Sequence, residues 1–271
     1  KEIRAALPLI KHLRSVYIGG GTPVSLPLDL LERILQTVGK VDCEYTVEAG
    51  RPDCIDDATL TLLKKYGVTR VCVNPQSFSD KTLALIGRKH SAKDVIDKFA
   101  LAKKYGFIVN TDLIAGLTGE TFEDFKRSID IAVGLSPENI TVHTLSRKRG
   151  SNLMAQDAPI PDGEAVGEML DFAGTVLPRA GYAPYYLYRQ KFMSGGFENV
   201  GWTRPGQENL YNICIMEELC SILAMGGGAS TKLVCPGGRL ERHIDPKYPT
   251  EYIANIDRIC AAKAELEAFF Q

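Results

Sequence analysis

The sequence lacks an excess of charge of either sign. Lysines and arginines number 32 and aspartates and glutamates 33, which gives a net charge of -1 at pH 7. Binding to the phosphates of nucleic acids or to an anionic lipid surface requires a concentrated positive field, which this composition does not provide. We therefore expect neither a nucleic acid nor a membrane as a partner.

Long hydrophobic runs are missing as well. No stretch approaches the ~18 consecutive apolar residues of a membrane-spanning helix, and the first residues show no hydrophobic segment of a secretory signal. The hydrophobic residues, 45% of the 271, are dispersed along the chain, as in a globular protein with a large core. The sequence predicts a cytoplasmic protein.

Closely spaced cysteines are also absent. The seven cysteines are scattered, and no two of them stand at CxxC spacing. Metal sites built from four cysteines and the disulfide frameworks of secreted proteins both need closer or paired spacings. We therefore predict reduced thiols and no metal-binding site within this chain.

What the sequence does contain is a repeated alternation of strand and helix patterns. Runs rich in β-branched residues recur every ~30 residues, the length of one β/α unit. Between the first two runs, four apolar residues stand at helical spacing and predict a helix that covers one face of a sheet; they are Leu31, Ile34, Leu35 and Val38. The predicted strands cover residues 15–20, 44–50, 70–77, 108–116 and 139–145.

This rhythm predicts an α/β protein with a partial (β/α) TIM-type barrel over residues 1–150 and a smaller C-terminal α+β region over residues 151–271. A polar, turn-rich stretch interrupts the series near residue 150, and a helical pattern at 251–270 predicts a terminal packing helix. The chain opens on a helical pattern with no strand before it. In a β/α unit the strand comes first, so we expect one further unit upstream of Lys1.

The first predicted strand runs into the loop GGGTP, which comprises Gly19, Gly20, Gly21, Thr22 and Pro23. This loop has neither the GK[ST] ending of a phosphate-binding P-loop nor the spacing of a dinucleotide fingerprint. Three glycines would let backbone groups approach a small ligand closely, and the proline stiffens the exit. A plain tight turn is the alternative.

Polar residues also stand at the ends of the other predicted strands: Glu48, Asn74, Gln76, Asp112 and His143. In β/α barrels, the carboxyl ends of the strands meet at one face, where binding and catalytic groups gather. Each residue alone could be a structural ion pair or a satisfied core group. Together they favour a site, because a carboxylate in a buried strand needs a ligand or a partner.

Several motifs, in this order, resemble one known family. GGGTP, EYTVEAGRPD, VCVNPQSFSDKTLALIGRKH and NTDLIAGLTGET are similar to the radical S-adenosylmethionine (SAM) enzymes of the oxygen-independent coproporphyrinogen III oxidase group. PYYLYRQK and ENVGW resemble its coproporphyrinogen dehydrogenase branch. The resemblance spans nearly the whole chain and implies a partial barrel of the radical SAM kind. It also implies that SAM contacts Gly19, Gly20, Gly21, Thr22, Glu48, Gln76, Arg88 and Asp112.

Members of this family bind a 4Fe-4S cluster through a CxxxCxxC loop after the first barrel strand, and this chain has no such loop. The resemblance therefore implies cluster ligands upstream of Lys1 and an inactive chain without them. The complete enzyme would convert the propionates of coproporphyrinogen III to vinyl groups through a deoxyadenosyl radical, in porphyrin and heme biosynthesis. It would need an electron donor protein, and no residue is assigned as catalytic.

A tetracarboxylate substrate would need cationic anchors and aromatic walls. The candidates are Arg147, Arg149, Tyr186, Tyr188 and Arg189, although the arginines could line a solvated turn and the tyrosines a half-buried strand. Two other functions stay open. One is a heme-binding or heme-delivery protein of the same family without oxidase activity. The other is an ordinary β/α-barrel enzyme with Glu48 and Asp112 as acid and base.

Overall fold

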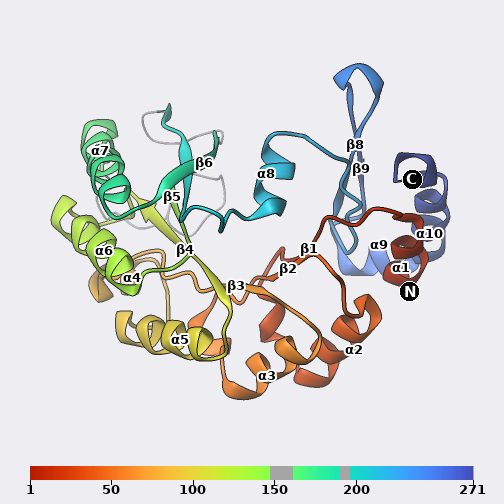
Figure 1. Cartoon of the computed structure of the whole chain (residues 1–271), viewed down its shortest axis with the longest axis horizontal. Coiled ribbons are helices and arrows are strands. Elements are labelled where there is room, and N and C mark those ends of the chain that lie inside the picture. The colour runs from red at the N-terminus through yellow and green to blue at the C-terminus, as the bar shows by residue number, and fades with distance from the viewer. Residues whose placement is uncertain (147–160, 190–195, 271) are drawn as a thin grey trace.

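The computed structural model describes residues 1–146, 161–189 and 196–270. The described part contains a curved seven-stranded sheet in the order β1-β2-β3-β4-β5-β7-β6, which forms a half-open barrel (Figure 1). The first five strands are parallel, and β7 and β6 continue the sheet antiparallel. The strands are β1 (Ser15–Ile18), β2 (Glu44–Val47), β3 (Arg70–Cys72), β4 (Ile108–Ala115), β5 (Asn139–Thr144), β6 (Ala183–Tyr188) and β7 (Asn199–Thr203).

Helices cover the convex side of this sheet, and Figure 1 shows α2, α3, α5 and α6 along it. Five of the six helices on that side begin at a side-chain cap, with capping boxes at Ser91 and Thr121. The helices of this layer are α2 (Leu28–Val38), α3 (Asp57–Lys65), α4 (Asp80–Leu85), α5 (Ala92–Lys104), α6 (Phe122–Leu135) and α7 (Gly163–Arg179).

The five predicted strands and the half-barrel are confirmed, with shorter strands than predicted. The repeated Lys-Lys-Tyr-Gly step ends α3 and α5 as its sequence suggests, because Gly67 and Gly106 both adopt a left-handed backbone, with φ of 82° and 71°. The prediction of one continuous terminal helix is wrong. The segment is divided at Asn255 into α9 (Pro249–Ala254) and α10 (Ile256–Ala264), and Ile253 is exposed.

The strands separate two environments by simple alternation. Tyr45 and Val47 of β2 and Val71 of β3 lie on the convex side of the sheet, where they are fully buried in the core between the sheet and the helices. The residues between them point into the half-barrel. The inward positions are Glu44, Thr46 and Glu48 in and just after β2; Arg70, Cys72 and Asn74 in and just after β3; Asn110 and Asp112 in β4; and Asn139, Thr141 and His143 in β5.

The base of the half-barrel is held by Arg70, whose side chain is 3% exposed. Its Nη1 donates to the side-chain oxygens of Asn110, at 2.8 Å, and of Asn139. Its Nη2 lies 3.2 Å from Glu44 Oε2 and donates to the carbonyls of Gln207 and Glu208. One guanidinium therefore joins strands β2 to β5 to the segment that precedes helix α8 (Leu210–Met216).

Helix α8 closes the open side of the half-barrel by contacting both edge strands (Figure 1). Tyr211 stacks on Tyr17 of β1 with ring centroids 4.2 Å apart, and Asn212 donates to Tyr185 of β6 at 3.1 Å. Glu44 accepts the backbone N–H groups of Leu210 and Tyr211, each at 3.1 Å. The carboxylate that pairs with Arg70 therefore also caps this helix.

The chain ends pack together beside this closure. Helix α1 (Glu2–Ala6) contacts α10, near the hairpin of β8 (Ser230–Val234) and β9 (Leu240–Ile244). The buried Lys263 ammonium lies 2.6 Å from Glu2 Oε1 and 2.7 Å from Asp245 Oδ2. The loop before β8 joins this cluster, because the Gly226 N–H donates to Glu2 Oε2 at 2.9 Å. Short 3-10 helices are Leu7–Leu9, Pro23–Ser25, Pro52–Cys54, Pro236–Gly238 and Glu267–Phe269.

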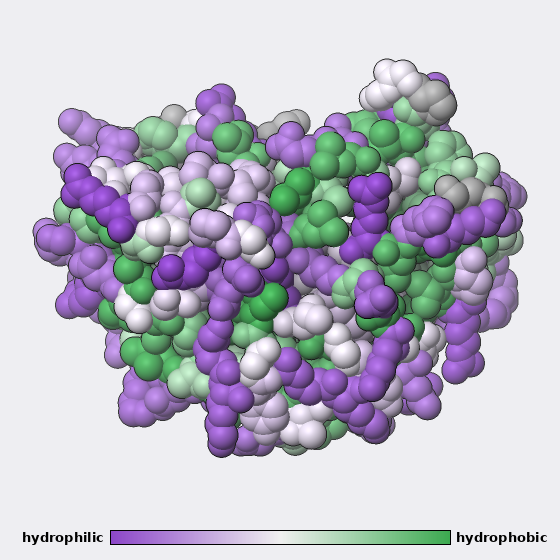
Figure 2. Space-filling view, in the orientation of Figure 1, coloured by the Kyte–Doolittle hydropathy of each residue, from purple (hydrophilic) through white to green (hydrophobic). Residues whose placement is uncertain are grey.

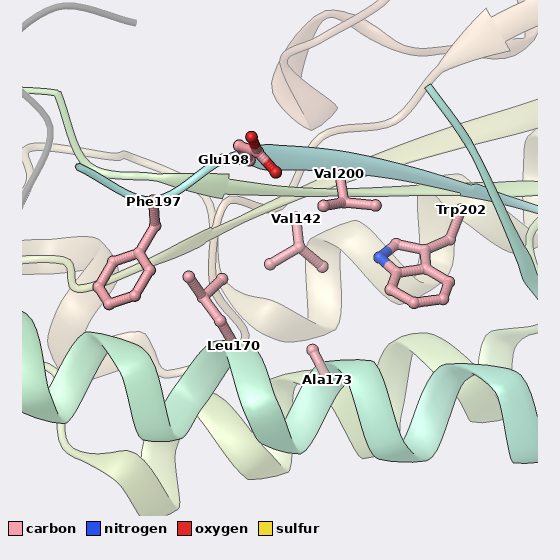
Figure 3. Close-up of a pocket in the computed structure, with 7 residues that line it drawn as sticks. All are labelled: Val142, Leu170, Ala173, Phe197, Glu198, Val200 and Trp202. Atoms are coloured by element: carbon pink, nitrogen blue, oxygen red, sulfur yellow. The ribbon is translucent and has the colours of Figure 1, made fainter. Parts of the chain in front are cut away.

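An apolar cavity of about 200 Å³ lies between α7 and the convex side of the sheet. Figure 3 shows Val142, Val200 and Trp202 pointing from the strands towards Ala173 of the helix, while the Glu198 carboxylate points away. This cavity is thus separated by the sheet from the inward-facing polar residues. On the surface, hydrophobic residues gather over α8 and the β8-β9 hairpin, and the rim is mostly hydrophilic (Figure 2). Within the described ranges, no helix is long and apolar enough to cross a membrane.

We expect the variant Arg70→Met to lower the free energy of unfolding by about 3–5 kcal/mol, because it leaves the Glu44 carboxylate without its buried cation. Arg239→Met is the matched control, since its ion pair with Glu241 is exposed and should contribute less than about 1 kcal/mol. Urea unfolding of the three proteins gives the comparison. Equal losses in both variants would contradict a central role for Arg70.

Candidate functional site

The site begins with Glu48, at the carboxyl end of β2. Its backbone N–H donates to Ile18 of β1 at 2.9 Å, and its carboxylate accepts the hydroxyl of Tyr17. Burial raises the pKa of Glu48 above its ordinary value, the Tyr17 hydrogen bond offsets part of the rise, and the neighbouring Asp112 carboxylate adds to it. Two carboxylates thus face the same interior, and each favours a ligand that brings positive charge or donors.

The glycine loop lies against this carboxylate. A Cβ on Gly19 would stand 2.6 Å from the Tyr17 ring and 2.9 Å from Glu48 Cδ, so only glycine fits here. Gly20, with φ of 91°, needs the left-handed backbone and places its N–H where it lowers the pKa of Glu48. The three glycines are exposed and Thr22 is half-buried. The loop therefore offers bare backbone beside a carboxylate.

Asp112, in the middle of β4, is the second carboxylate. Asn74 Nδ2 donates to Asp112 Oδ2 at 2.8 Å, and His143 Nε2 lies 3.7 Å from the same oxygen. About a quarter of the Asp112 side chain, 26%, is exposed. The Asn74 Oδ1 atom is buried and accepts no hydrogen bond from the described part of the chain. A ligand with donor groups would satisfy this orphan acceptor and the open Asp112 carboxylate together.

Gln76 follows β3 in a left-handed conformation, with φ of 67°, which is rare for a residue other than glycine. Its backbone is fixed to β4, because its N–H donates to Asp112 O at 3.0 Å and its carbonyl accepts from Ile114 at 2.9 Å. The next residue, Ser77, donates to the buried Glu120 at 2.9 Å. These bonds hold the strained turn in place.

Arg88 follows α4 and is half-buried. Burial is the main cause of a lowered pKa for Arg88, and the positive charge of Arg51 lowers this pKa further. The Asp53 carboxylate raises it and so offsets part of the shift. Asp53 is occupied by Arg51 through two hydrogen bonds. No hydrogen bond from the described residues reaches the Arg88 guanidinium. A half-buried cation in this state suits an anionic group such as a ligand carboxylate.

The tyrosines predicted as a substrate wall belong to β6. The Tyr186 ring lies directly on Gly201 of β7, where a Cβ would be 1.9 Å from the ring, and its hydroxyl is 3.1 Å from Thr141 Oγ1. The Tyr188 hydroxyl is 3.1 Å from His143 Nδ1. Tyr186 and Tyr188 stack with centroids 6.2 Å apart. The two rings therefore line the interior beside the carboxylates.

Of the predicted arginine anchors, the structure describes Arg189. Arg189 is 68% exposed and lies 3.3 Å from Glu198. Arg147 and Arg149 lie outside the described residues, as does the boundary near residue 150. Two contributors escaped the sequence analysis. Alternation along β1 places Tyr17 on the inward side with Gly19 and could have revealed it, whereas Tyr211 reaches the site only through the packing of α8.

The interior suits SAM on structural grounds. SAM carries an ammonium group and ribose hydroxyls as donors, and the interior presents two carboxylates and the buried Asn74 oxygen. The carboxylate of SAM is an anion, and the Arg88 guanidinium makes no hydrogen bond to a described residue. The iron–sulfur cluster does not fit in the same way. Among the residues that the structure describes, no three His, Cys, Asp or Glu side chains come together as metal ligands.

Comparison with known proteins agrees with this picture. The family model described as Radical SAM superfamily matches residues 1–132. The chain is 40% identical to the oxygen-independent coproporphyrinogen-III oxidase-like protein HemZ of Bacillus subtilis, over 95% of this chain and 54% of that protein. It is 32% identical to the heme chaperone HemW of the same organism, over 69% of this chain and 52% of HemW. The chain thus spans about half the length of these relatives.

A solved structure has the same fold. Coproporphyrinogen III oxidase (HemN) from Escherichia coli aligns with a TM-score of 0.73, covering 99% of this chain and 67% of HemN. The sequence identity is 18%, so this likeness establishes the architecture alone. The predicted half-barrel is confirmed by this architecture together with the radical SAM family model over residues 1–132.

Glu120 provides a test of how the Gln76 turn is fixed. Burial raises the pKa of Glu120 to about 8, against hydrogen bonds from Ser77 and the Leu117 N–H, so the folded chain holds it protonated at neutral pH. A folded pKa above the unfolded value contributes stability that is full below pH 4.5 and lost as the pH rises to about 8.

We therefore expect Glu120→Gln, which keeps the neutral shape, to lose less stability than the wild type between pH 5 and pH 8 in urea unfolding. Glu123→Gln is the control, because its side chain is 75% exposed. Parallel pH curves for the wild type and Glu120→Gln would exclude a protonated Glu120.

Proposed function

Because residues 1–132 belong to the radical SAM superfamily, we propose that this chain binds SAM at the strand ends of its half-barrel and is part of a coproporphyrinogen dehydrogenase. The observation that carries the proposal is the group of inward-facing acceptors: Glu48, Asp112 and the orphan Asn74 oxygen, beside the bare backbone of Gly19. The higher identity and coverage of the HemZ match support an oxidase-like function.

Different residues of this chain would bind different groups of SAM. Glu48, oriented by Tyr17 and the Gly20 N–H, and Asp112 would accept hydrogen bonds from the ammonium and hydroxyl groups, and Arg88 would pair with the carboxylate. Gln76 and Thr22 lie on the loops that border this space. The chemistry that the bound cofactor supplies in the family is a carbon-centred radical, able to take hydrogen from a propionate side chain.

The substrate side would be the tyrosine wall. Tyr186 and Tyr188 offer flat apolar faces, and their hydroxyls are held by Thr141 and His143, so the rings are fixed before a ligand arrives. A porphyrinogen has both apolar pyrroles and acidic side chains, which matches a wall of this kind. Arg147, Arg149 and Arg189 remain proposed anchors for the acidic groups, and the electron donor and the cluster ligands are proposed to come from outside this chain.

We expect the chain to bind SAM in isothermal titration calorimetry, and Asp112→Ala to weaken that binding roughly 10- to 100-fold through loss of charge-assisted hydrogen bonds. The exposed Asp130→Ala on α6 serves as the matched control and should leave the dissociation constant unchanged. Thermal unfolding of each variant verifies the fold. A wild-type chain that gives no SAM binding at saturating ligand would remove the proposal.

The heme chaperone HemW relatives make heme delivery the second candidate. Spectroscopic titration with heme, next to a porphyrinogen turnover assay of the full-length protein with its cluster, separates the two. We expect turnover and weak heme binding. Tight one-to-one heme binding without turnover would establish the chaperone function instead.

A further inference from the structure

We propose that His143 is a positioning residue that aims the Asp112 carboxylate at the cofactor and connects it to the tyrosine wall. The inference rests on the proposed function and adds to it a residue that the motifs do not assign. It is drawn from the contacts that surround one carboxylate.

Among the described residues, Asn74 and His143 both approach one oxygen of Asp112. Asn74 Nδ2 of the segment after β3 is 2.8 Å from Oδ2, and His143 Nε2 of β5 is 3.7 Å from it. No described residue donates a hydrogen bond to Oδ1. The carboxylate is thus hydrogen-bonded by Asn74 and approached by His143 on the same oxygen, and Oδ1 has no donor among the described residues.

The hydrogen-bond roles of the imidazole follow from its neighbours. Asp112 Oδ2 is an acceptor, so we assign the imidazole hydrogen to Nε2, the nitrogen that faces it. Nδ1 is then the acceptor, and it lies 3.1 Å from the Tyr188 hydroxyl, which donates. Tyr188, His143 and Asp112 thus stand in a row, in which the Tyr188 hydrogen bond orients the imidazole with Nε2 towards Asp112.

His143 differs from the other inward residues of its strand. Asn139 and Thr141 serve structural partners, Arg70 and Tyr186, and both are at least 95% buried. The His143 side chain is 24% exposed, and its distance of 3.7 Å to Asp112 exceeds that of a hydrogen bond. Such contacts are often long before a ligand binds and shorten afterwards. One imidazole thereby joins the cofactor side of the site to the wall on β6.

The test is a double-mutant cycle on SAM binding by calorimetry. We expect His143→Leu to raise the SAM dissociation constant about fivefold, the effect of one hydrogen bond of ordinary strength. His143→Gln, whose amide N–H can reach the same oxygen, should restore most of the affinity. His12→Leu, at an exposed position, should bind as the wild type does. In an Asp112→Ala background, His143→Leu should have no further effect.

The outcomes separate this inference from the function on which it rests. A wild-type chain that does not bind SAM removes both. Wild-type binding that His143→Leu leaves unchanged removes only the role of His143. A fivefold loss that persists in the Asp112→Ala background shows that His143 acts by its own contact, and it overturns the positioning role. Thermal unfolding midpoints within error of the wild type exclude a loss caused by unfolding.

Discussion

The guanidinium of Arg70 is the interaction on which the rest of this structure depends. A half-barrel has no closing strand, so its inward side chains need another way to fill and fix the base. One buried cation, bonded to Asn110, Asn139 and Glu44, holds four strands at one level, and its bonds to two carbonyls bring helix α8 onto the open side. The spacing of the strand ends, and hence of Glu48 and Asp112, follows from that base.

Strict alternation along the strands lets the same short segments serve packing and binding. Outward residues such as Val71 and Leu113 are completely buried under the helices, and the inward residues between them are polar. At the base, Arg70 donates to the side-chain oxygens of Asn110 and Asn139. Nearer the strand ends, the buried Asn74 Oδ1 has no hydrogen-bond partner among the described residues. The buried Arg70–Glu44 pair thus lies at the base of the half-barrel, and the candidate site lies at the strand ends.

Much of this arrangement could be predicted from the sequence because it is local. Strand spacing, glycine caps and the polar strand ends all lie within a few residues of the features that define them, and Glu48, Asp112 and His143 emerged in this way. Contacts between distant segments could not be predicted. The sequence around Arg70 does not indicate that its side chain binds the carbonyls of residues 207 and 208, and the sequence around Tyr211 does not indicate that its ring stacks on Tyr17. The division of the terminal helix at Asn255 reflects tertiary packing that overrides helical periodicity.

The closure by helix α8 has a consequence for how such a protein can change in evolution. In a barrel closed by strands, the circumference takes only discrete values, because every hydrogen bond around the ring must stay in register. Here the last step of the ring is made by side chains, by a tyrosine stack on β1 and an amide–hydroxyl contact on β6. The circumference of the half-barrel interior can therefore vary continuously with the length and tilt of helix α8. A larger or smaller ligand could be accommodated without an additional strand.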